Sequence, residues 1–528
     1  MRLTLKRVFF IAWIAFILGS IPSITVFLKE FASFSFETGV MLSPRFHAAA
    51  SEIAGAVRQY AWHILIAYTI IISMVIFMEN QNPDRTILWL LTLALLPVAG
   101  LLIYFIFGPE FSYQKVKKRF APGKGLPPPA SETSGDSRLL LERLLFTSSG
   151  AEIMPNNKIK IFTDGREKFD ALKADIRRAT CCINMQYFVI KDDYLGQEIS
   201  EELAAAARRG VKIRLLYDAV GSFQLPRGFI RRLAEAGVEC HSFMPMSFPR
   251  LRRKMNFRNH RKIAVIDNTI AYTGGFNIGK EYLGDGPLGY WRDTHVRFEG
   301  DAVQDINKIF LQDWCFRSGD DPTLITDERA ADFCEPLPVT PEAQVPPLPM
   351  QVVASGVNSP WHPISQGFFN MIARAGERMW ITSPYFVPGA SFMRAVTSTA
   401  LAGVDVRLLL PSKKDHFLVF WGSRSNYENL LRAGVRIFLY KKGFIHAKIL
   451  LADDEISSVG TCNMDERSLH INFENQLFIY DKDVNAEFAA QFEKDLDDSQ
   501  EIELDEWVKR PLWQKVIESF ARIFSAQI

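Results

Sequence analysis

The chain has 528 residues, 48% of them hydrophobic, and a formal net charge of +2. This composition excludes collagen-like, wholly disordered and small disulfide-rich chains. The near-neutral net charge argues against a protein that coats nucleic acid through bulk charge. At about 150 residues per domain, the length corresponds to roughly three domain-sized units.

Apolar residues are concentrated before residue 110, in three uncharged segments: 8–28, 60–78 and 86–107. Segments of 19 to 22 residues can cross a hydrocarbon core of about 30 Å as helices. The second and third are close in sequence and predict a helical hairpin. The first is open to other interpretations, a signal sequence or an anchor that does not cross. We therefore expect a membrane anchor over 1–110 with two or three transmembrane helices.

Basic residues in 115–119 follow the last apolar segment, and others in 2–7 precede the first. The positive-inside rule places both clusters in the cytoplasm, which conflicts with three crossings. We give more weight to the hairpin and the larger cluster. The bulk of the chain is therefore expected to be cytoplasmic.

Two Pro-rich stretches, 111–137 and 318–350, are predicted linkers around the first of two similar regions. These regions, 138–317 and 351–505, are each expected to form one domain. The remaining residues, 506–528, place apolar side chains at helical spacing and predict an amphipathic tail, either at a membrane interface or docked on the core.

The similarity between the two regions is an internal repeat. Tyr187-Phe-Val and Tyr385-Phe-Val are each followed by a helical run, ending at Gly210 and Gly403, and then by a Val-containing strand. Glycine after a helix is a C-cap signal, and strand–helix–strand units form sheets covered by helices. The repeat predicts an α/β fold of two tandem halves related by a pseudo-twofold, each with a mixed sheet flanked by helices.

Each half contains one H-x-K-x-x-x-x-D element, and the same 186-residue offset relates all three positions. The predicted catalytic residues are His260, Lys262 and Asp267 in the first half and His446, Lys448 and Asp453 in the second. Two inert hairpins would not be expected to keep all three residues in both copies. An Asn follows each element at the same offset, Asn277 and Asn463.

The spacing within each element suggests separate roles. His and Lys, two residues apart before an apolar strand, share a face, whereas the Asp falls on the opposite face. Asp267 and Asp453 each precede a second turn-forming residue. We interpret each Asp as a structural residue of a hairpin turn more than as a proton carrier.

Two histidines, two lysines and two asparagines that converge across a pseudo-twofold predict a phosphate site. The predicted phosphate-binding residues are Lys262, Asn277, Lys448 and Asn463. One neutral imidazole can attack phosphorus while the other, protonated, gives its proton to the leaving alkoxide.

Two carboxylates at strand starts, Asp293 and Glu474, are candidates for orienting the imidazoles; surface acids are the alternative. No cluster has metal-ligand spacing, and we predict neither a metal nor another cofactor. The six cysteines contain no C-x-x-C pair and are interpreted as reduced, free thiols.

The duplicated elements resemble the HKD signature of the phospholipase D superfamily. Further segments resemble bacterial cardiolipin synthases: Arg258–Ile263, Tyr272–Gly279, Ser383–Pro388, Lys441–Lys448 and Asn472–Asn475. The resemblance extends over nearly the whole chain from about residue 60, and all six HKD positions match.

This resemblance implies transphosphatidylation in a bacterial inner (plasma) membrane, with phosphatidylglycerol as both donor and acceptor and other membrane lipids as partners. His260 would attack the donor phosphodiester, and glycerol would leave with a proton from His446. A second phosphatidylglycerol would then attack the phosphatidyl-histidine to give cardiolipin. Nucleic acid is not an expected partner, and the oligomeric state is not indicated.

Several alternatives remain at the level of sequence. They are a phospholipase D-type hydrolase, an HKD nuclease, a synthase that uses a different acceptor lipid, and a non-catalytic membrane scaffold. The stretch Arg250–Lys262 holds seven basic residues and no acid. Such a stretch would attract anionic headgroups at about 1 kcal/mol per charge, and a nucleic-acid patch or a solvated loop is its alternative interpretation.

Overall fold

The computed structural model divides the chain into two units, Met1–Pro109 and Glu110–Ile528. In the first unit it describes residues 63, 67, 69–74, 76, 83–96 and 100. In the second it describes residues 137–244, 257–318, 347–357 and 359–523.

In the first unit, helix α4 covers Pro83–Leu95. Among the described residues, no helix is both long enough and apolar enough to cross a membrane. The predicted span 8–28 lies outside the described residues, and 60–78 and 86–107 are described only in part.

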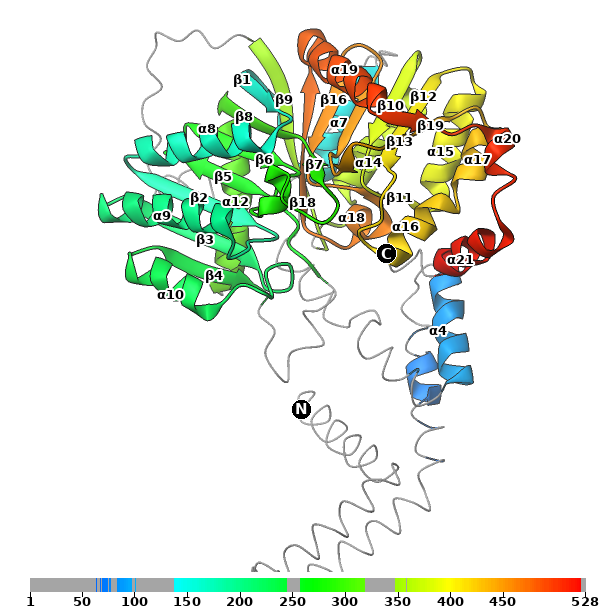
Figure 1. The fold of residues 1–528 in the computed structure, drawn as a ribbon, viewed down its shortest axis with the longest axis horizontal. Coiled ribbons are helices and arrows are strands. Elements are labelled where there is room, and N and C mark those ends of the chain that lie inside the picture. Colours follow the sequence, from blue (N-terminus) through cyan, green and yellow to red (C-terminus); the bar gives the residue numbers. More distant parts are fainter. Residues whose placement is uncertain are drawn as a thin grey trace, which may run out of the picture. The chain divides into compact units, whose positions relative to one another are not determined.

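The second unit consists of two halves of similar element order (Figure 1). The first half comprises α7 (Ser137–Ser149), β1 (Met154–Phe162), α8 (Gly165–Arg178), β2 (Cys182–Tyr187), α9 (Tyr194–Arg208), β3 (Lys212–Asp218), α10 (Arg227–Glu235), β4 (Glu239–Phe243), β5 (Ile263–Ile266), β6 (Ile270–Gly274), the 3-10 helix η1 (Lys280–Leu283), β7 (Tyr290–Arg292), β8 (His295–Gly300) and α12 (Ala302–Ser318).

The second half follows a similar order, with further short elements within it and at its end. It comprises β9 (Pro347–Ser355), α14 (Pro363–Arg374), β10 (Arg378–Thr382), β11 (Phe386–Val387), α15 (Gly389–Leu401), β12 (Asp405–Pro411), α16 (Phe417–Arg424), α17 (Tyr427–Arg432), β13 (Arg436–Tyr440), β14 (Gly443–Ile445), β15 (Ile449–Ala452), β16 (Ile456–Gly460), β17 (Met464–Asp465), α18 (Glu466–His470), β18 (Glu474–Tyr480), α19 (Lys482–Asp497), β19 (Ser499–Glu501), α20 (Leu504–Trp507) and α21 (Leu512–Ile523).

The two halves share one continuous sheet of 15 strands. The antiparallel pair β1–β9 lies at its centre. Outward from this pair the order is β8-β6-β5-β2-β3-β4 in the first half and β18-β16-β15-β10-β12-β13 in the second, with β19 beyond β13. The sequence predicted mixed sheets in two halves, and the structure joins them edge to edge. β9 begins at Pro347, inside the stretch 318–350 that was predicted as a linker.

The predicted strand–helix–strand units are present in both halves. β2 pairs in parallel with β3, and β10 pairs in parallel with β12, as expected when a helix connects two strands. β2 is buried throughout, because helices cover both faces of the sheet.

The core lies in layers on the two faces of this sheet. On one face, α8, α9 and α10 cover the first half and α14, α15 and α17 cover the second. On the other face, α12 and α19 pack over the middle of the sheet through residues such as Phe310 and Phe488. Helix α7 belongs to the first half in sequence, but its Leu141 and Leu145 pack in the core of the second half with Phe368.

Short backbone pairings connect the halves near their midpoint. β7 pairs in parallel with β14, and Asn259 forms an isolated bridge with Phe473. These pairings bring the segments that carry the HKD elements against segments of the opposite half.

Four of the six cysteines are free thiols: Cys182, Cys240, Cys315 and Cys462. Cys181 is disulfide-bonded, so the prediction of a free thiol is wrong at that position.

Candidate active site

The two HKD elements directly precede equivalent hairpins. His260 and Lys262 lie just before β5, which pairs with β6, and His446 and Lys448 lie just before β15, which pairs with β16. All four residues are at most 8% exposed. The sequence prediction that each Asp occupies the following hairpin turn is confirmed.

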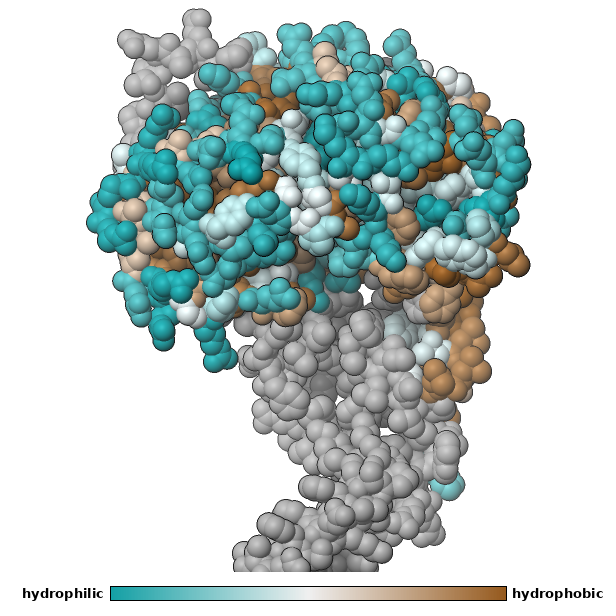
Figure 2. Space-filling model, in the orientation of Figure 1, coloured by the Kyte–Doolittle hydropathy of each residue, from teal (hydrophilic) through white to brown (hydrophobic). Residues whose placement is uncertain are grey.

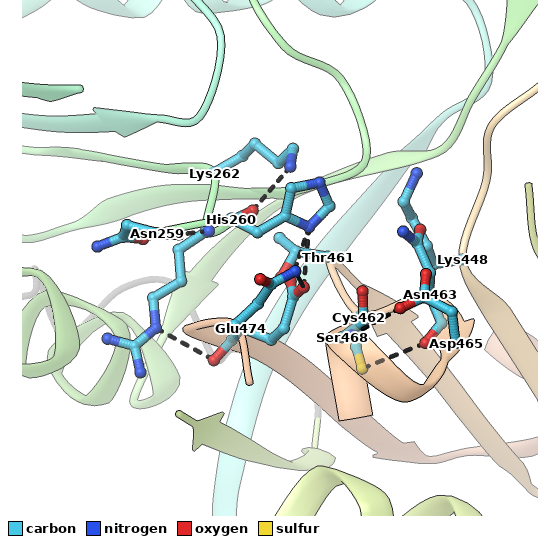
Figure 3. A network of polar contacts seen from close by, with 12 residues as sticks. Asn259, His260, Lys262, Lys448, Thr461, Cys462, Asn463, Asp465, Ser468 and Glu474 are labelled. Carbon is cyan, nitrogen blue, oxygen red and sulfur yellow. Dashed lines mark hydrogen bonds and ion pairs between the residues drawn. The ribbon is translucent and has the colours of Figure 1, made fainter. Parts of the chain in front are cut away.

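The His260 ring binds a carboxylate from the other half. Its Nδ1 atom lies 2.9 Å from Oε1 and 3.0 Å from Oε2 of Glu474 (Figure 3). The backbone sets this contact, because the His260 amide donates to the carbonyl of Phe473, the residue before Glu474, at 2.9 Å. Thr461 Oγ1 donates to Glu474 Oε2 at 2.5 Å and holds the carboxylate in place.

His446, from the second half, contacts a carboxylate of the first half in the same way. Its Nδ1 atom lies 2.6 Å from Oδ2 of Asp293. The His446 amide donates to the carbonyl of Arg292, the residue before Asp293, at 2.7 Å. Asp293 and Glu474 are both fully buried. The two predicted histidine-orienting carboxylates therefore contact the histidines, and each pair crosses between the halves.

The lysines lie beside the backbone of their own histidines. Lys262 Nζ donates to the His260 carbonyl at 2.7 Å (Figure 3). Lys448 Nζ donates to the His446 carbonyl and lies 2.8 Å from His446 Nδ1. Burial lowers the pKa of Lys262 well below its usual value and lowers that of Lys448 to about 8.

Both imidazoles are shifted toward the neutral form. Burial, followed by repulsion from Lys448, lowers the pKa of His446 to about 4. Burial also lowers the pKa of His260, against the attraction of Glu474. A neutral imidazole whose Nδ1–H donates to a carboxylate has its lone pair on Nε2, where it can act as a nucleophile or a base. Both shifts therefore favour the neutral imidazole in the free protein.

A cavity of about 730 Å³ runs along these groups. Both halves line it, and its walls include Phe188, Arg258, His260, Asn277, Tyr282, Trp291, Tyr385, Asp415, Phe417, His446, Asn463, Asp465, Arg467, Ser468 and Asn472. The structure thus brings both histidines and both asparagines to one cavity, as the repeat predicted.

The two asparagines differ in their contacts. Asn277 accepts from the Val189 amide at 3.2 Å and donates to the Tyr282 hydroxyl at 2.9 Å. Asn463 Oδ1 is buried and finds no hydrogen-bond partner among the described residues. Of the two predicted phosphate-binding amides, Asn463 is therefore the one with an unsatisfied polar atom at the cavity.

Asp267 and Asp453 were grouped with the predicted catalytic residues, but their carboxylates bind the backbone at the start of a neighbouring strand. Asp267 accepts from the amides of Cys181 and Cys182 at 2.8 and 2.9 Å, before β2. Asp453 accepts from the amides of Gly376 and Glu377 at 3.0 and 2.8 Å, before β10. Both have positive φ, 51°, which Asp tolerates in a turn. We therefore assign both to the hairpin turns instead of the reaction centre.

Two residues of the cavity wall, Arg467 and Ser468, carried no usable signal in the sequence; they lie on the short helix α18, after Asn463. The stretch Lys413–His416, which follows a strand and was a candidate for the site entrance, does contribute Asp415 and His416 to the wall. Asp415 accepts a hydrogen bond from the hydroxyl of Tyr385, which lies within the segment Ser383–Pro388. Residues in loops and short helices have no periodicity that would mark them as cavity-lining.

Comparisons with known proteins agree with this geometry. The family model described as "Cardiolipin synthase, PLD-like domain" matches residues 172–314 and 368–496. A second model, "Phospholipase D-nuclease N-terminal", matches residues 64–109. The structure also resembles a phosphatidylserine synthase from Haemophilus influenzae, with a TM-score of 0.57 and 15% identity over 74% of this chain and 100% of that one, which supports the fold.

Two relatives are similar over most of their length. Cardiolipin synthase 2 of Bacillus anthracis is 40% identical over 86% of this chain and 89% of its own. Cardiolipin synthase of Halalkalibacterium halodurans is 37% identical over 88% of this chain and 93% of its own. With two matched domains that carry the paired His–carboxylate geometry, the chain belongs to the cardiolipin synthase family of phospholipase D-like proteins.

Proposed function

We propose that this protein is a phosphatidyltransferase that converts two molecules of phosphatidylglycerol into cardiolipin and glycerol through a phosphatidyl-histidine intermediate. The observation that carries the proposal is the pair of buried His–carboxylate contacts, His260–Glu474 and His446–Asp293, at one cavity. Two imidazoles around one phosphate provide a nucleophile and a general acid at the same time.

In the first step, His260 Nε2 attacks the phosphorus of the donor lipid. The bond from phosphorus to the glycerol headgroup oxygen breaks, and that oxygen takes a proton from His446. His446 is neutral in the free protein, so it must take up a proton from solvent when the substrate binds. A phosphodiester in the cavity carries a negative charge, which would offset Lys448 and raise the pKa of His446.

In the second step, neutral His446 accepts the proton of the acceptor hydroxyl. The acceptor oxygen bonds to phosphorus, the phosphorus–nitrogen bond breaks, and the electron pair returns to His260 Nε2. The resemblance assigns attack to His260, and the near-symmetric contacts of His446 would support the mirrored assignment equally well. Identification of the modified histidine therefore decides between the two orders.

Lys262, Lys448 and Asn463 are the proposed ligands of the nonbridging phosphate oxygens. Their burial removes competing water, so the lysine charges and the Asn463 amide dipole interact more strongly with an anion than they would in solvent. Burial acts to raise the pKa of Glu474, but contacts with His260, Lys262 and Thr461 outweigh it, so the net shift is downward and favours the ionised carboxylate. It can therefore keep a proton on His260 Nδ1 throughout the reaction.

We also propose that the protein works at a bacterial inner (plasma) membrane. The match of residues 64–109 to an N-terminal family model supports a role for 1–110 as the anchor, with two or three transmembrane helices. In this arrangement, 111–137 is a linker, 138–317 and 351–505 are the two repeated domains around the stretch 318–350, and the catalytic region is cytoplasmic.

The C-terminal helix supports a membrane contact within the second unit itself. Its polar side is held to the protein, because Glu518, 2% exposed, pairs with Arg510 at 2.9 Å and Arg424 at 3.3 Å. Its apolar side faces outward, with Leu512 77% and Val516 60% exposed. Figure 2 shows hydrophobic side chains gathered over α21 and α16.

This apolar surface continues to the cavity. α16 packs against α21 through Trp421 and Trp513, whose rings lie 5.9 Å apart. The other end of α16 contributes Phe417, Leu418 and Val419 to the cavity wall. A lipid could therefore keep its acyl chains in the bilayer while its headgroup enters the cavity.

The test is product analysis after reconstitution with phosphatidylglycerol alone. The proposal predicts cardiolipin and glycerol in equal amounts, and no product from the His260→Asn or His446→Asn variant. Phosphatidic acid as the main product would establish a hydrolase instead. Cleavage of added DNA, without any lipid product, would establish a nuclease.

A further inference from the structure

The stretch between β12 and α16 brings a carboxylate into the cavity wall that the proposed steps do not use. Asp415 lies in this stretch, Tyr385 lies between β10 and β11, and both line the cavity. The Asp415 side chain is 13% exposed. Because β10 and β12 are parallel neighbours, both residues follow the carboxyl ends of adjacent strands, where ligands of α/β sheets commonly bind.

Tyr385 and the backbone hold the Asp415 carboxylate in place. The Tyr385 hydroxyl donates to Oδ2, and the His416 amide donates to Oδ1 at 2.7 Å. His416 Nε2 lies 3.8 Å from Oδ2, and the His416 side chain is 71% exposed. A carboxylate offers about four acceptor sites. Asp415 can therefore accept a further hydrogen bond from a ligand in the cavity.

The stretch that carries Asp415 is held on the His446 side of the cavity. Lys413 Nζ donates to the carbonyl of Leu288, just before β7, at 2.8 Å. β7 pairs with β14, and His446 directly follows β14. Burial lowers the pKa of Lys448 to about 8, and attraction to carboxylates that include Asp415 opposes this effect. Asp415 therefore lies within electrostatic reach of the reaction centre.

The two other carboxylates of the cavity wall have structural partners. Glu281 forms an ion pair with Lys191 at 2.7 Å. Asp465 caps helix α18, where it accepts from the Ser468 amide at 2.7 Å. Of the three acids of the wall, Asp415 is therefore the one best placed for a ligand.

The proposed steps bring two glycerol units to the same position. His446 gives a proton to the oxygen of the leaving glycerol, and it later takes the proton of the attacking hydroxyl. Both oxygens therefore occupy the place beside His446. In each glycerol unit, the carbon next to the reacting end carries a secondary hydroxyl. This hydroxyl is a hydrogen-bond donor that the leaving group and the acceptor share.

We propose that Asp415, positioned by Tyr385, accepts a hydrogen bond from this secondary hydroxyl and thereby selects glycerol headgroups for the reaction. The inference rests on the proposed function and names a specificity-determining residue of the same cavity. A hydroxyl that donates to a carboxylate forms a charge-assisted hydrogen bond, which is stronger than one between neutral groups. An alcohol without this hydroxyl forfeits the bond and should react more slowly.

Competition between two free alcohols tests this role. Enzyme reconstituted with phosphatidylglycerol receives equal amounts of labelled glycerol and 1,3-propanediol, which lacks only the secondary hydroxyl. The oxygen of either alcohol bonds to phosphorus, the phosphorus–nitrogen bond to the histidine breaks, and the proton passes to His446. Because both alcohols compete for one intermediate, the product ratio reports the acceptor step alone. We expect a preference for glycerol of about 10- to 100-fold, the range for a hydrogen bond to a charged group.

Variants of the two residues should change this ratio. Asp415→Ala removes the acceptor, so the preference for glycerol should disappear. Asp415→Asn keeps the shape and one neutral acceptor oxygen, and it should retain part of the preference. Tyr385→Phe removes the positioning hydrogen bond but leaves the carboxylate, so its ratio should be intermediate. Only folded, active molecules form products, so a loss of folded protein does not alter the ratio.

The matched control is Asp285→Ala. Asp285 accepts a hydrogen bond from the Tyr194 hydroxyl at 2.6 Å, which is the same kind of contact, but neither residue lines the cavity. This variant should keep the preference of the unmodified enzyme. A change as large as that in Asp415→Ala would overturn the assignment.

Three further results would also overturn it. They are equal use of both alcohols by the unmodified enzyme, an unchanged ratio in Asp415→Ala, and a preference for ethanolamine when it is added as a third competitor. Ethanolamine carries an ammonium where glycerol has the secondary hydroxyl, and we expect the nearby Lys448 to repel it. Failure of the proposed function has a different signature, because the unmodified enzyme would then make phosphatidic acid and transfer to neither alcohol.

Discussion

His260 Nδ1 lies 2.9 Å from Oε1 of Glu474, although the two residues belong to different halves of the chain. His446 and Asp293 repeat the relationship at 2.6 Å. Neither half by itself contains a complete His–carboxylate pair. The proposed reaction centre therefore forms only where the two halves meet, and the single sheet through β1 and β9 joins them.

Loss of the Glu474 charge should disable His260 without unfolding the protein. Glu474→Gln keeps the side-chain shape but no longer stabilises the His260 Nδ1 proton. We expect the rate of cardiolipin formation to fall about 10²- to 10⁴-fold, the usual range for a mispositioned or wrongly protonated catalytic histidine. Turnover per folded molecule, with thermal unfolding as the check on folding, measures this.

The matched control is Glu493→Gln, at an exposed position on α19. It makes the same chemical change and should leave turnover unaffected. A Glu474→Gln enzyme with more than a tenth of normal turnover would contradict the orienting role.

Asp267 and Asp453 should matter for stability more than for chemistry. Asp267 accepts from the amides of Cys181 and Cys182 with Oδ1 and from the amide and hydroxyl of Thr180 with Oδ2, so Asp267→Asn puts an amide donor in place of one of these acceptors. We expect a loss of about 1–3 kcal/mol in the free energy of unfolding, with turnover per folded molecule changed only a few-fold. Denaturant unfolding and active-site titration give the two quantities. Normal stability with severely reduced turnover would return these residues to the reaction centre.

The lowered pKa of Lys448 predicts that kcat/KM falls at alkaline pH. Its pKa of about 8 means that the ammonium is charged below this pH and neutral above it. If the charge binds phosphate, kcat/KM should fall as the pH rises through about 8, because kcat/KM reports the free enzyme. In Lys448→Arg the cation persists, so the fall should move to higher pH. An unchanged profile in that variant would show that another group causes the fall.

The outward face of α21 should determine access to bilayer substrate. Trp513→Ser with Val516→Ser removes two exposed apolar side chains, each contributing about 1.5–3 kcal/mol if buried in lipid. We expect KM for phosphatidylglycerol in nanodiscs to rise at least about tenfold, with turnover of a dispersed short-chain analogue unchanged.

Leu401→Ser is the control for this double variant, because Leu401 is 72% exposed but lies on α15. It should affect neither substrate. Equal effects of the two variants on the nanodisc substrate would mean that α21 has no special role at the membrane.

Much of the fold was predictable because its signals are local. Gly210 and Gly403 follow the ends of helices α9 and α15, as their position before Val-containing strands predicted. The turn role of Asp267 also followed from spacing alone. The convergence of the HKD histidines followed from the repeat, since two copies of one domain can meet across a pseudo-twofold.

The cross-half contacts were not predictable, because they depend on which distant segments pair. Nothing near Glu474 in the sequence distinguishes His260 from His446 as its partner. The sequence also does not indicate which edge strands join the two sheets, because β1 and β9 have no local feature that distinguishes them from other edge strands. Arg467 lies on a helix too short to show a pattern, so its place in the cavity depends on tertiary structure.

A stalled intermediate would reveal whether His260 carries the phosphatidyl group. A donor with a p-nitrophenol leaving group needs no acid, so His446→Asn should release one equivalent of p-nitrophenol and then stall. Mass spectrometry of the stalled enzyme should find the phosphatidyl group on His260. If His446→Asn gives no adduct while the reciprocal variant, His260→Asn, accumulates a phosphatidyl group on His446, then His446 is the nucleophile and His260 is not.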